Sequence, residues 1–272
     1  MSWSGWSIEP PLAYVALAGL LYWLGGRGYR SSDRQRLRTT AFVAGLVTIV
    51  LALDSPIDGY ADQLFWVHMV QHVLLLTVAP PLILLGRPWP RMWRALPIAM
   101  RTTVGRGMAC SRWSAPLRAL ARPKAAWVLF NAAIVLWHVS GAYGATLRSD
   151  AIHQIEHATF FFTGMLFWAR VIDPGPLRPR LVWPVRIAYV VGAMVVGWGL
   201  AIALVLSPDP LYAHYAALGH RPGGVSALTD QQLAGGIMWV PGSLAYAVAV
   251  LIGFYRWLEP ESAAGPSRPA LT

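Results

Sequence analysis

Five of the seven histidines lie inside long apolar stretches, where an imidazole without a partner is costly and marks a candidate functional site. His68 and His72 are the ends of the segment HMVQH, and His153 and His157 are the ends of HQIEH. The i, i+4 spacing places both rings of each pair on one face of a helix. His138 lies in a third apolar stretch. This pattern predicts a metal or haem site shared by three helices.

Imidazole ligands suit copper, zinc or iron, and a site with few carboxylates disfavours magnesium and calcium. Glu156 lies beside His157 and three residues after His153, so it could orient an imidazole, bind the metal directly or act as a base. The thioether of Met238 would suit Cu(I). We expect copper, as Cu(I), with zinc or haem as alternatives. The secondary candidate residues are Glu156, Asp230, Met238, His214 and His220.

The composition is that of a membrane protein, because 56% of the 272 residues are hydrophobic and only 12% are charged. Soluble domains carry about 25% charged residues. A helix needs about 20 residues to cross a bilayer, and backbone groups in hydrocarbon must bond one another, so spans are helices. We predict one all-α domain at residues 1–258, a bundle of seven transmembrane helices, the second of them short. They lie at Pro11–Gly26, Thr39–Leu53, Asp62–Gly86, Lys124–Thr146, Ser149–Ile172, Trp183–Leu206 and Asp230–Trp257.

The distribution of basic residues predicts the orientation of this bundle. The connections Arg27–Arg38 and Arg87–Lys124 are rich in arginine, whereas Arg148 and Arg221 are the basic residues of the opposite connections. Basic loops stay in the cytoplasm, so the N-terminus is predicted outside and the C-terminus inside. The net charge of +10 is therefore a topology signal, and we expect no nucleic-acid partner.

This orientation places the five histidines in the outer half of the bundle. At a rise of 1.5 Å per residue, His72, His138 and His157 lie about 12–15 Å deep and form one layer. His68 lies ~9 Å and His153 ~6 Å deep by the same rise. The other two histidines fall in the outer connection between the last two spans. The metal site is thus predicted toward the periplasmic side.

The remaining segments suggest no second domain. Residues 87–123 alternate arginines with large apolar side chains and predict a cytoplasmic segment at the lipid interface. Residues 259–272 are rich in Pro, Ser and Ala and predict a disordered cytoplasmic tail. No cleavable signal peptide is apparent, and the one cysteine, Cys110, excludes a disulfide framework and a thiolate metal site.

Several short motifs occur together in a fixed order. HMVQH is followed by APPL at residues 79–82 and GRP at 86–88. His138 follows Trp137 and precedes Tyr143, and HQIEH leads to Phe167–Trp168 and Asp173–Pro174. DQQLAGGIMWVPG then spans residues 230–242. From about Asp54 to Trp257 the chain resembles the CtaG family, the assembly factors of caa3-type cytochrome c oxidase.

The resemblance implies a seven-span protein of the bacterial inner (plasma) membrane that helps insert copper into a haem–copper oxidase. The family's histidines would correspond to His68, His72, His138, His153 and His157, and its acidic motif to Asp230. The expected partners are the oxidase subunits, a periplasmic copper donor and the lipid bilayer. Because ligands must be unprotonated, copper binding should weaken below about pH 6, near the ordinary imidazole pKa.

Three other functions fit parts of the sequence. HQIEH matches the H-x-x-E-H pattern of inverted zinc proteases, which would make the chain an intramembrane zinc hydrolase. Paired histidines on two spans could instead bind haem b in an electron carrier. A copper or proton transporter is a third alternative, although the inner halves of the spans carry few polar groups.

Overall fold

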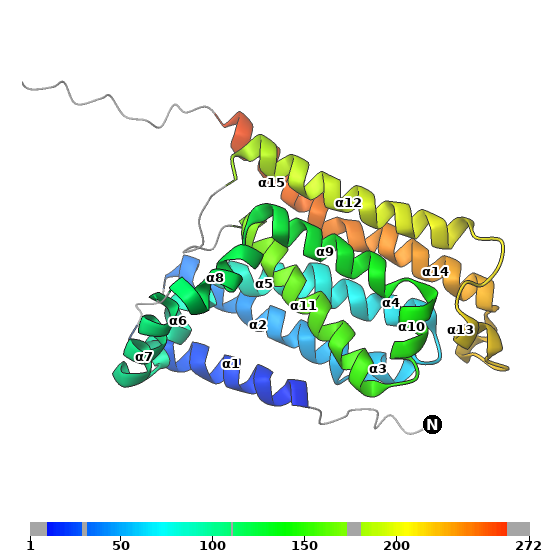
Figure 1. The fold of residues 1–272 in the computed structure, drawn as a ribbon, viewed down its shortest axis with the longest axis horizontal. Coiled ribbons are helices and arrows are strands. Elements are labelled where there is room, and N and C mark those ends of the chain that lie inside the picture. Colours follow the sequence, from blue (N-terminus) through cyan, green and yellow to red (C-terminus); the bar gives the residue numbers. More distant parts are fainter. Residues whose placement is uncertain (1–9, 29–31, 110, 173–180, 260–272) are drawn as a thin grey trace, which may run out of the picture.

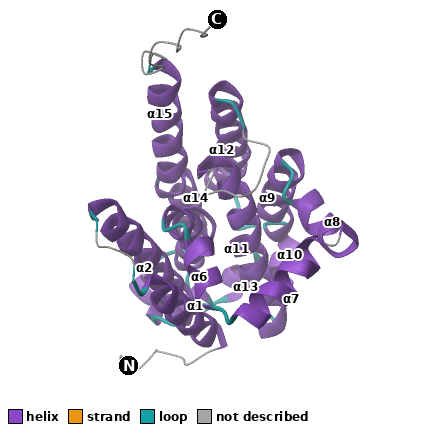
Figure 2. Ribbon diagram, turned by 90° about the vertical axis from the view of Figure 1, so that its left-hand side faces the viewer, coloured by secondary structure: helices purple, strands orange, loops and turns teal. Residues whose placement is uncertain are grey.

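The computed structural model describes residues 10–28, 32–109, 111–172 and 181–259, and this part of the chain consists of helices and connecting loops without strands (Figure 2). The predicted tail from residue 260 onward, Cys110 and the Asp173–Pro174 motif lie outside it. The elements are α1 (Pro10–Gly26), α2 (Asp33–Leu53), α3 (Pro56–Ala61), α4 (Phe65–Val73), the π-helix η1 (Leu74–Val78), α5 (Ala79–Leu85), α6 (Pro88–Ala95), α7 (Ile98–Ala109), α8 (Ser111–Leu120), α9 (Pro123–Trp137), α10 (Ser140–Thr146), α11 (Asp150–Ile172), α12 (Trp183–Leu206), α13 (Ala213–Ala217), η2 (Pro222–Gly224), α14 (Ala227–Trp239), η3 (Pro241–Ser243) and α15 (Leu244–Leu258).

The long helices run along one axis of the molecule, and the short helices gather at its two ends (Figure 1). Helices α6, α7 and α8 lie at one end, whereas α3, α10 and α13 lie at the other. The arginine-rich connection therefore lies at the opposite end of the bundle from the connections that flank the histidines. Helix α11 packs against α9, η1 and α5 near the middle of the bundle.

Helix boundaries match the apolar windows in most places. The predicted sixth span coincides with α12, and the predicted second span begins too late, because α2 starts at Asp33. The Ser32 side chain caps α2 by accepting a hydrogen bond from the Gln35 N–H at 3.2 Å. Six more residues thus join α2, which reaches 21 residues and a length sufficient for a membrane span.

The predicted fourth span is wrong as a continuous helix. Helix α9 ends at Trp137, His138 is its capping residue, and extended Val139 turns the chain into the separate short helix α10. The Tyr212 hydroxyl donates a hydrogen bond to the His138 carbonyl at 2.9 Å and so satisfies a group that the helix end leaves free. The break places the His138 side chain at a helix end.

Length and composition support fewer membrane spans than the seven predicted. Four described stretches are long and apolar enough: Asp33–Leu53, Phe65–Leu85, Trp183–Leu206 and Ala227–Leu258. A fifth arises if α8 and α9, bent by 70°, form one broken span. Helix α11 has 23 residues but is not among them; His153, Glu156 and His157 lower its hydropathy.

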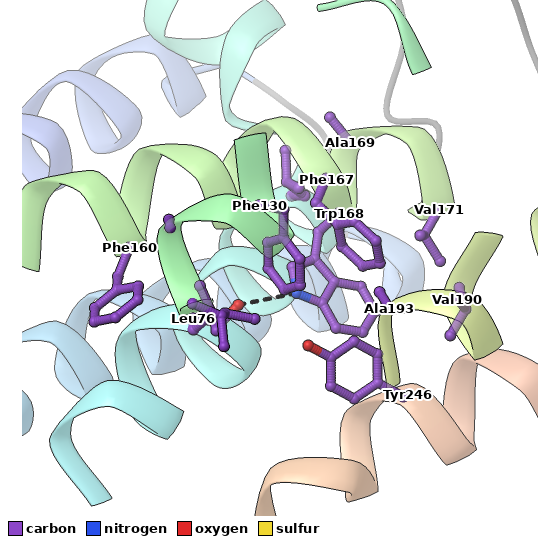
Figure 3. Packing of buried hydrophobic residues seen from close by; sticks show 13 residues of the cluster. Leu76, Phe130, Phe160, Phe167, Trp168, Ala169, Val171, Val190, Ala193 and Tyr246 are labelled. Atoms are coloured by element: carbon purple, nitrogen blue, oxygen red, sulfur yellow. Dashed lines mark hydrogen bonds between the residues drawn. The ribbon is translucent and has the colours of Figure 1, made fainter. Parts of the chain in front are cut away.

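The middle of the bundle is closed around Trp168 of α11 (Figure 3). Pro80 has no N–H to donate to the Leu76 carbonyl four residues earlier, and the chain forms the π-helix η1 just before it. The Trp168 indole N–H donates to that carbonyl at 3.0 Å. Gly164 lets α11 approach closely, because a Cβ there would lie 3.0 Å from the Leu76 oxygen. The APPL and Phe167–Trp168 motifs are thus two sides of one contact.

The segment predicted at the lipid interface forms α6, α7 and α8. Arg87 adopts a left-handed conformation, φ 47°, and turns the chain from α5 into α6. Arg91 of α6 is buried, with its guanidinium 4.4 Å from the Tyr22 ring and hydrogen-bonded to Thr39 at 3.0 Å. The start of this segment is therefore anchored to α1 and α2.

Candidate metal centre

Side chains of α4 and α11 converge at the end of the bundle where α3, α10 and α13 lie. Four of them, His68, His153, Glu156 and His157, each offer one ligand atom, and these atoms all lie within 4.8 Å of one another. We call this group the His/Glu cluster. Its two helices are far apart in sequence, but both predicted histidine pairs face the same point. The i, i+4 pattern therefore identified three members of the cluster, whereas the fourth, Glu156, was a secondary candidate.

Glu156 lies among the imidazoles of both helices. Its side chain has no exposed surface, and its two oxygens lie 3.7 Å from His68 Nε2 and 3.6 Å from His72 Nε2. These separations exceed hydrogen-bond length. Both carboxylate oxygens, and Nε2 of His68, His72, His153 and His157, are buried without a hydrogen-bond partner in the described part of the chain.

A buried carboxylate surrounded by unpaired imidazole nitrogens is an expensive arrangement. Burying an unpaired charge costs several kcal/mol, of the order of 3–5 kcal/mol when a partner is removed. A cation among these atoms would satisfy them together, since imidazole nitrogens and carboxylate oxygens are ligands of copper, zinc and iron. The donor set therefore fits a transition metal.

Tyr215 of α13 contacts the ring nitrogen of His68 that points away from Glu156. The Tyr215 hydroxyl donates to the Ala61 carbonyl at 2.6 Å, so its oxygen can accept from His68 Nδ1, which lies 3.4 Å away. This contact favours the tautomer with the proton on Nδ1 and leaves Nε2 free to face Glu156. Burial raises the pKa of Tyr215 above its ordinary value, so the hydroxyl stays protonated.

His72 and His138 lie beside the cluster. The His72 ring lies 5.9 Å from the His138 ring and 5.9 Å from the His157 ring, centroid to centroid. The His138 Nε2 instead faces the sulfur of Met69 at 3.3 Å. The three histidines predicted to form one layer therefore do not share one site. His157 belongs to the cluster, His138 faces Met69, and His72 lies between them.

Asp230 is placed away from the cluster and caps α4. Leu64, the N-cap residue of α4, offers no side-chain hydrogen bond, and the two oxygens of Asp230 accept from the N–H groups of Phe65 and Trp66 at 3.0 Å each. Arg221 Nε lies 3.9 Å from the same carboxylate. A carboxylate at a helix N-terminus is stabilising, so Asp230 helps to fix the helix that carries HMVQH.

The other secondary candidates are dispersed. His214 is exposed and its Nε2 donates to the Asp62 carbonyl at 3.2 Å, and His220 is exposed as well. Met238 lines a cavity together with Met69, His72 and His138. Sequence reasoning missed Tyr215 and Met69. Met69 follows His68 directly and lies three residues before His72, a spacing that could have revealed it.

The chain matches a known protein family over almost its whole length. The match covers residues 20–260 and is to the cytochrome c oxidase caa3 assembly factor family, Caa3_CtaG. The chain belongs to this family. The resemblance predicted from the motifs is thereby confirmed, and the family is named for a role in the assembly of cytochrome c oxidase.

Similar proteins occur in mycobacteria. Uncharacterized proteins of Mycobacterium bovis and Mycobacterium tuberculosis are each 29% identical over 232 residues, and one of Mycobacterium leprae is 26% identical over 229 residues. Each match covers 82% of this chain but 34% of the relative. The chain thus spans about one third of the length of these relatives. No solved structure matches it.

Proposed function

We propose that this protein carries copper as cargo for the assembly of a haem–copper oxidase and holds it at the His/Glu cluster with His72. The supporting observation is the convergence of five unpartnered buried groups, Glu156 and four imidazoles, on one point between α4 and α11. A cation with N/O ligands removes the cost of all of them at once. The oxidase in this proposal is inferred from the family, and the kind of metal is inferred from the nitrogen and oxygen ligands.

Copper fits this set better than the alternatives do. Haem would need axial imidazoles from α4 and α11 on opposite sides of a macrocycle, whereas the rings of His68 and His153 lie 5.0 Å apart and a Glu156 oxygen lies 3.7 Å from His68 Nε2. A zinc hydrolase needs its glutamate open to water and substrate, whereas Glu156 has no exposed surface. Cargo binding requires only ligands that can exchange.

The proposed topology has seven spans, with the N-terminus outside and the C-terminus in the cytoplasm. Helices α1, α9 and α11 would complete the set of spans, since each runs along the same axis as the four long apolar stretches (Figure 1). The arginine-rich α6–α8 end would then face the cytoplasm. The cluster would lie in the outer half, where a periplasmic donor and the oxidase subunits can reach it.

The test is copper binding to the purified protein in detergent. The wild type is loaded anaerobically with Cu(I) against a competing chelator, alongside the His153→Ala/His157→Ala variant and the matched control His214→Ala/His220→Ala. We expect stoichiometric copper in the wild type and the control, at least tenfold weaker binding of one copper ion in the cluster variant, and no Soret band in any of the three proteins. Equal copper affinity in all three proteins would refute the proposal.

A further inference from the structure

A cavity of about 50 Å³ lies next to the cluster, between α4, η1, α9, α12 and α14. Its polar lining includes His72 and His138, and the side chains of Met69 and Met238 belong to the lining as well. The rest of the lining is mostly apolar, and no carboxylate belongs to it. A water needs about 10–15 Å³ measured in this way, so the space suffices for an ion and a small ligand.

The hydrogen bond of His138 fixes which of its nitrogens faces the cavity with a lone pair. Nδ1 lies 2.7 Å from the Ile134 carbonyl, which can only accept, so the Nδ1 proton is donated there. In the neutral ring Nε2 then has no proton and cannot donate to the Met69 sulfur 3.3 Å away. Two lone-pair donors, one nitrogen and one thioether sulfur, therefore face each other.

This separation suits two ligands of one metal ion. With metal–nitrogen and metal–sulfur bonds of ~2.0 and ~2.3 Å, a nitrogen and a sulfur 3.3 Å apart subtend an angle of about 100° at the metal. Thioethers select soft ions such as Cu(I). Because these donors are neutral, they favour a monovalent ion over a divalent one.

His72 connects this cavity to the cluster. Its Nε2 lies 3.6 Å from Glu156, and both Nε2 and Nδ1 are buried without a hydrogen-bond partner among the described residues. The ring also lines the cavity. A single side chain thus has a free nitrogen for each site.

We propose that the cavity is a second metal site, for Cu(I), formed by His138 Nε2 and the sulfurs of Met69 and Met238. His72 is the ligand through which an ion moves between this site and the His/Glu cluster. The binding site stands on its own donors, whereas the movement through His72 rests on the proposed function of the cluster.

The test uses Ag(I), a soft monovalent probe, and compares the wild type with Met69→Leu/Met238→Leu and with Glu156→Gln/His153→Ala. Leucine conserves the volume of methionine, so the first variant should remain folded. We expect Ag(I) binding to weaken at least tenfold in the methionine variant and to persist in the cluster variant. Equal Ag(I) affinity in the methionine variant and the wild type would refute the second site.

X-ray absorption of the Cu(I)-loaded protein gives a readout independent of affinity. In a Cys110→Ser background, which removes the one cysteine, we expect a sulfur scatterer at ~2.3 Å that the methionine variant lacks. A copper spectrum with nitrogen and oxygen scatterers alone would overturn the assignment. If the cluster variant keeps its full copper content while the methionine variant loses it, the proposed function of the cluster fails and the second site stands.

Discussion

Helix α11 has two regions that differ in whether their buried polar groups form hydrogen bonds. In its first two turns, Glu156 and His157 are buried without hydrogen-bond partners. About three turns later the Trp168 indole N–H is paired with the Leu76 carbonyl, and the rings around it stack, as Phe130 and Phe167 do at 4.2 Å (Figure 3). The second region is arranged for stability. The first leaves buried polar groups without hydrogen bonds at a cost in stability, which is the arrangement expected at a functional site.

The largest effect on stability should come from the paired region. Phe167→Ala removes a ring that stacks on Phe130 and on Tyr189 at 4.9 Å, and large-to-small changes of this kind cost about 3–5 kcal/mol. Copper affinity per folded molecule should not change. Thermal unfolding in detergent and metal titration of the folded fraction measure the two effects. A loss of copper affinity with intact stability would show that the two regions are not separable.

Glu156→Gln tests the unpaired region with the opposite expectation. Because the carboxylate is buried without a hydrogen bond, its neutralisation should leave the metal-free protein as stable as the wild type or more stable. Copper at about a thousandfold excess over its Kd should stabilise the wild type by ~4 kcal/mol, and the variant by much less. Unfolding with and without copper provides the measurement. A destabilised metal-free variant would instead make Glu156 a structural partner of His68 and His72.

A smaller effect should come from Asp230, which supports the unpaired region from outside. Asp230→Ala leaves the N–H groups of Phe65 and Trp66 without their acceptor, at a cost of about 1–2 kcal/mol. Copper affinity should fall less than in the cluster variants, since His68 keeps its place on α4. Asp230→Asn, which retains one carbonyl acceptor, is the matched control. A complete loss of copper in stable Asp230→Asn protein would make Asp230 a ligand.

Much of the fold was predictable because helices are local. The apolar window at Trp183–Leu206 has the same bounds as α12. The start of α2 was missed because its first residues, from Asp33 to Arg38, are mostly charged and so fall outside an apolar window. The break after Trp137 was not predictable in this way. It depends on Val139 leaving the helical conformation and on a hydroxyl of Tyr212, far along the chain, that satisfies the freed His138 carbonyl.

The sequence by itself determined most of the long helices, the spacing of the two histidine pairs and the family, since each depends on residues close together in the chain or on ordered motifs. Tertiary structure alone decided what each polar side chain faces. Glu156 faces His68 and His72, Asp230 caps a helix 165 residues away in sequence, and His138 turns to Met69. Periodicity gives the face of a helix on which a residue lies, but the partner of that face is set by packing between distant segments.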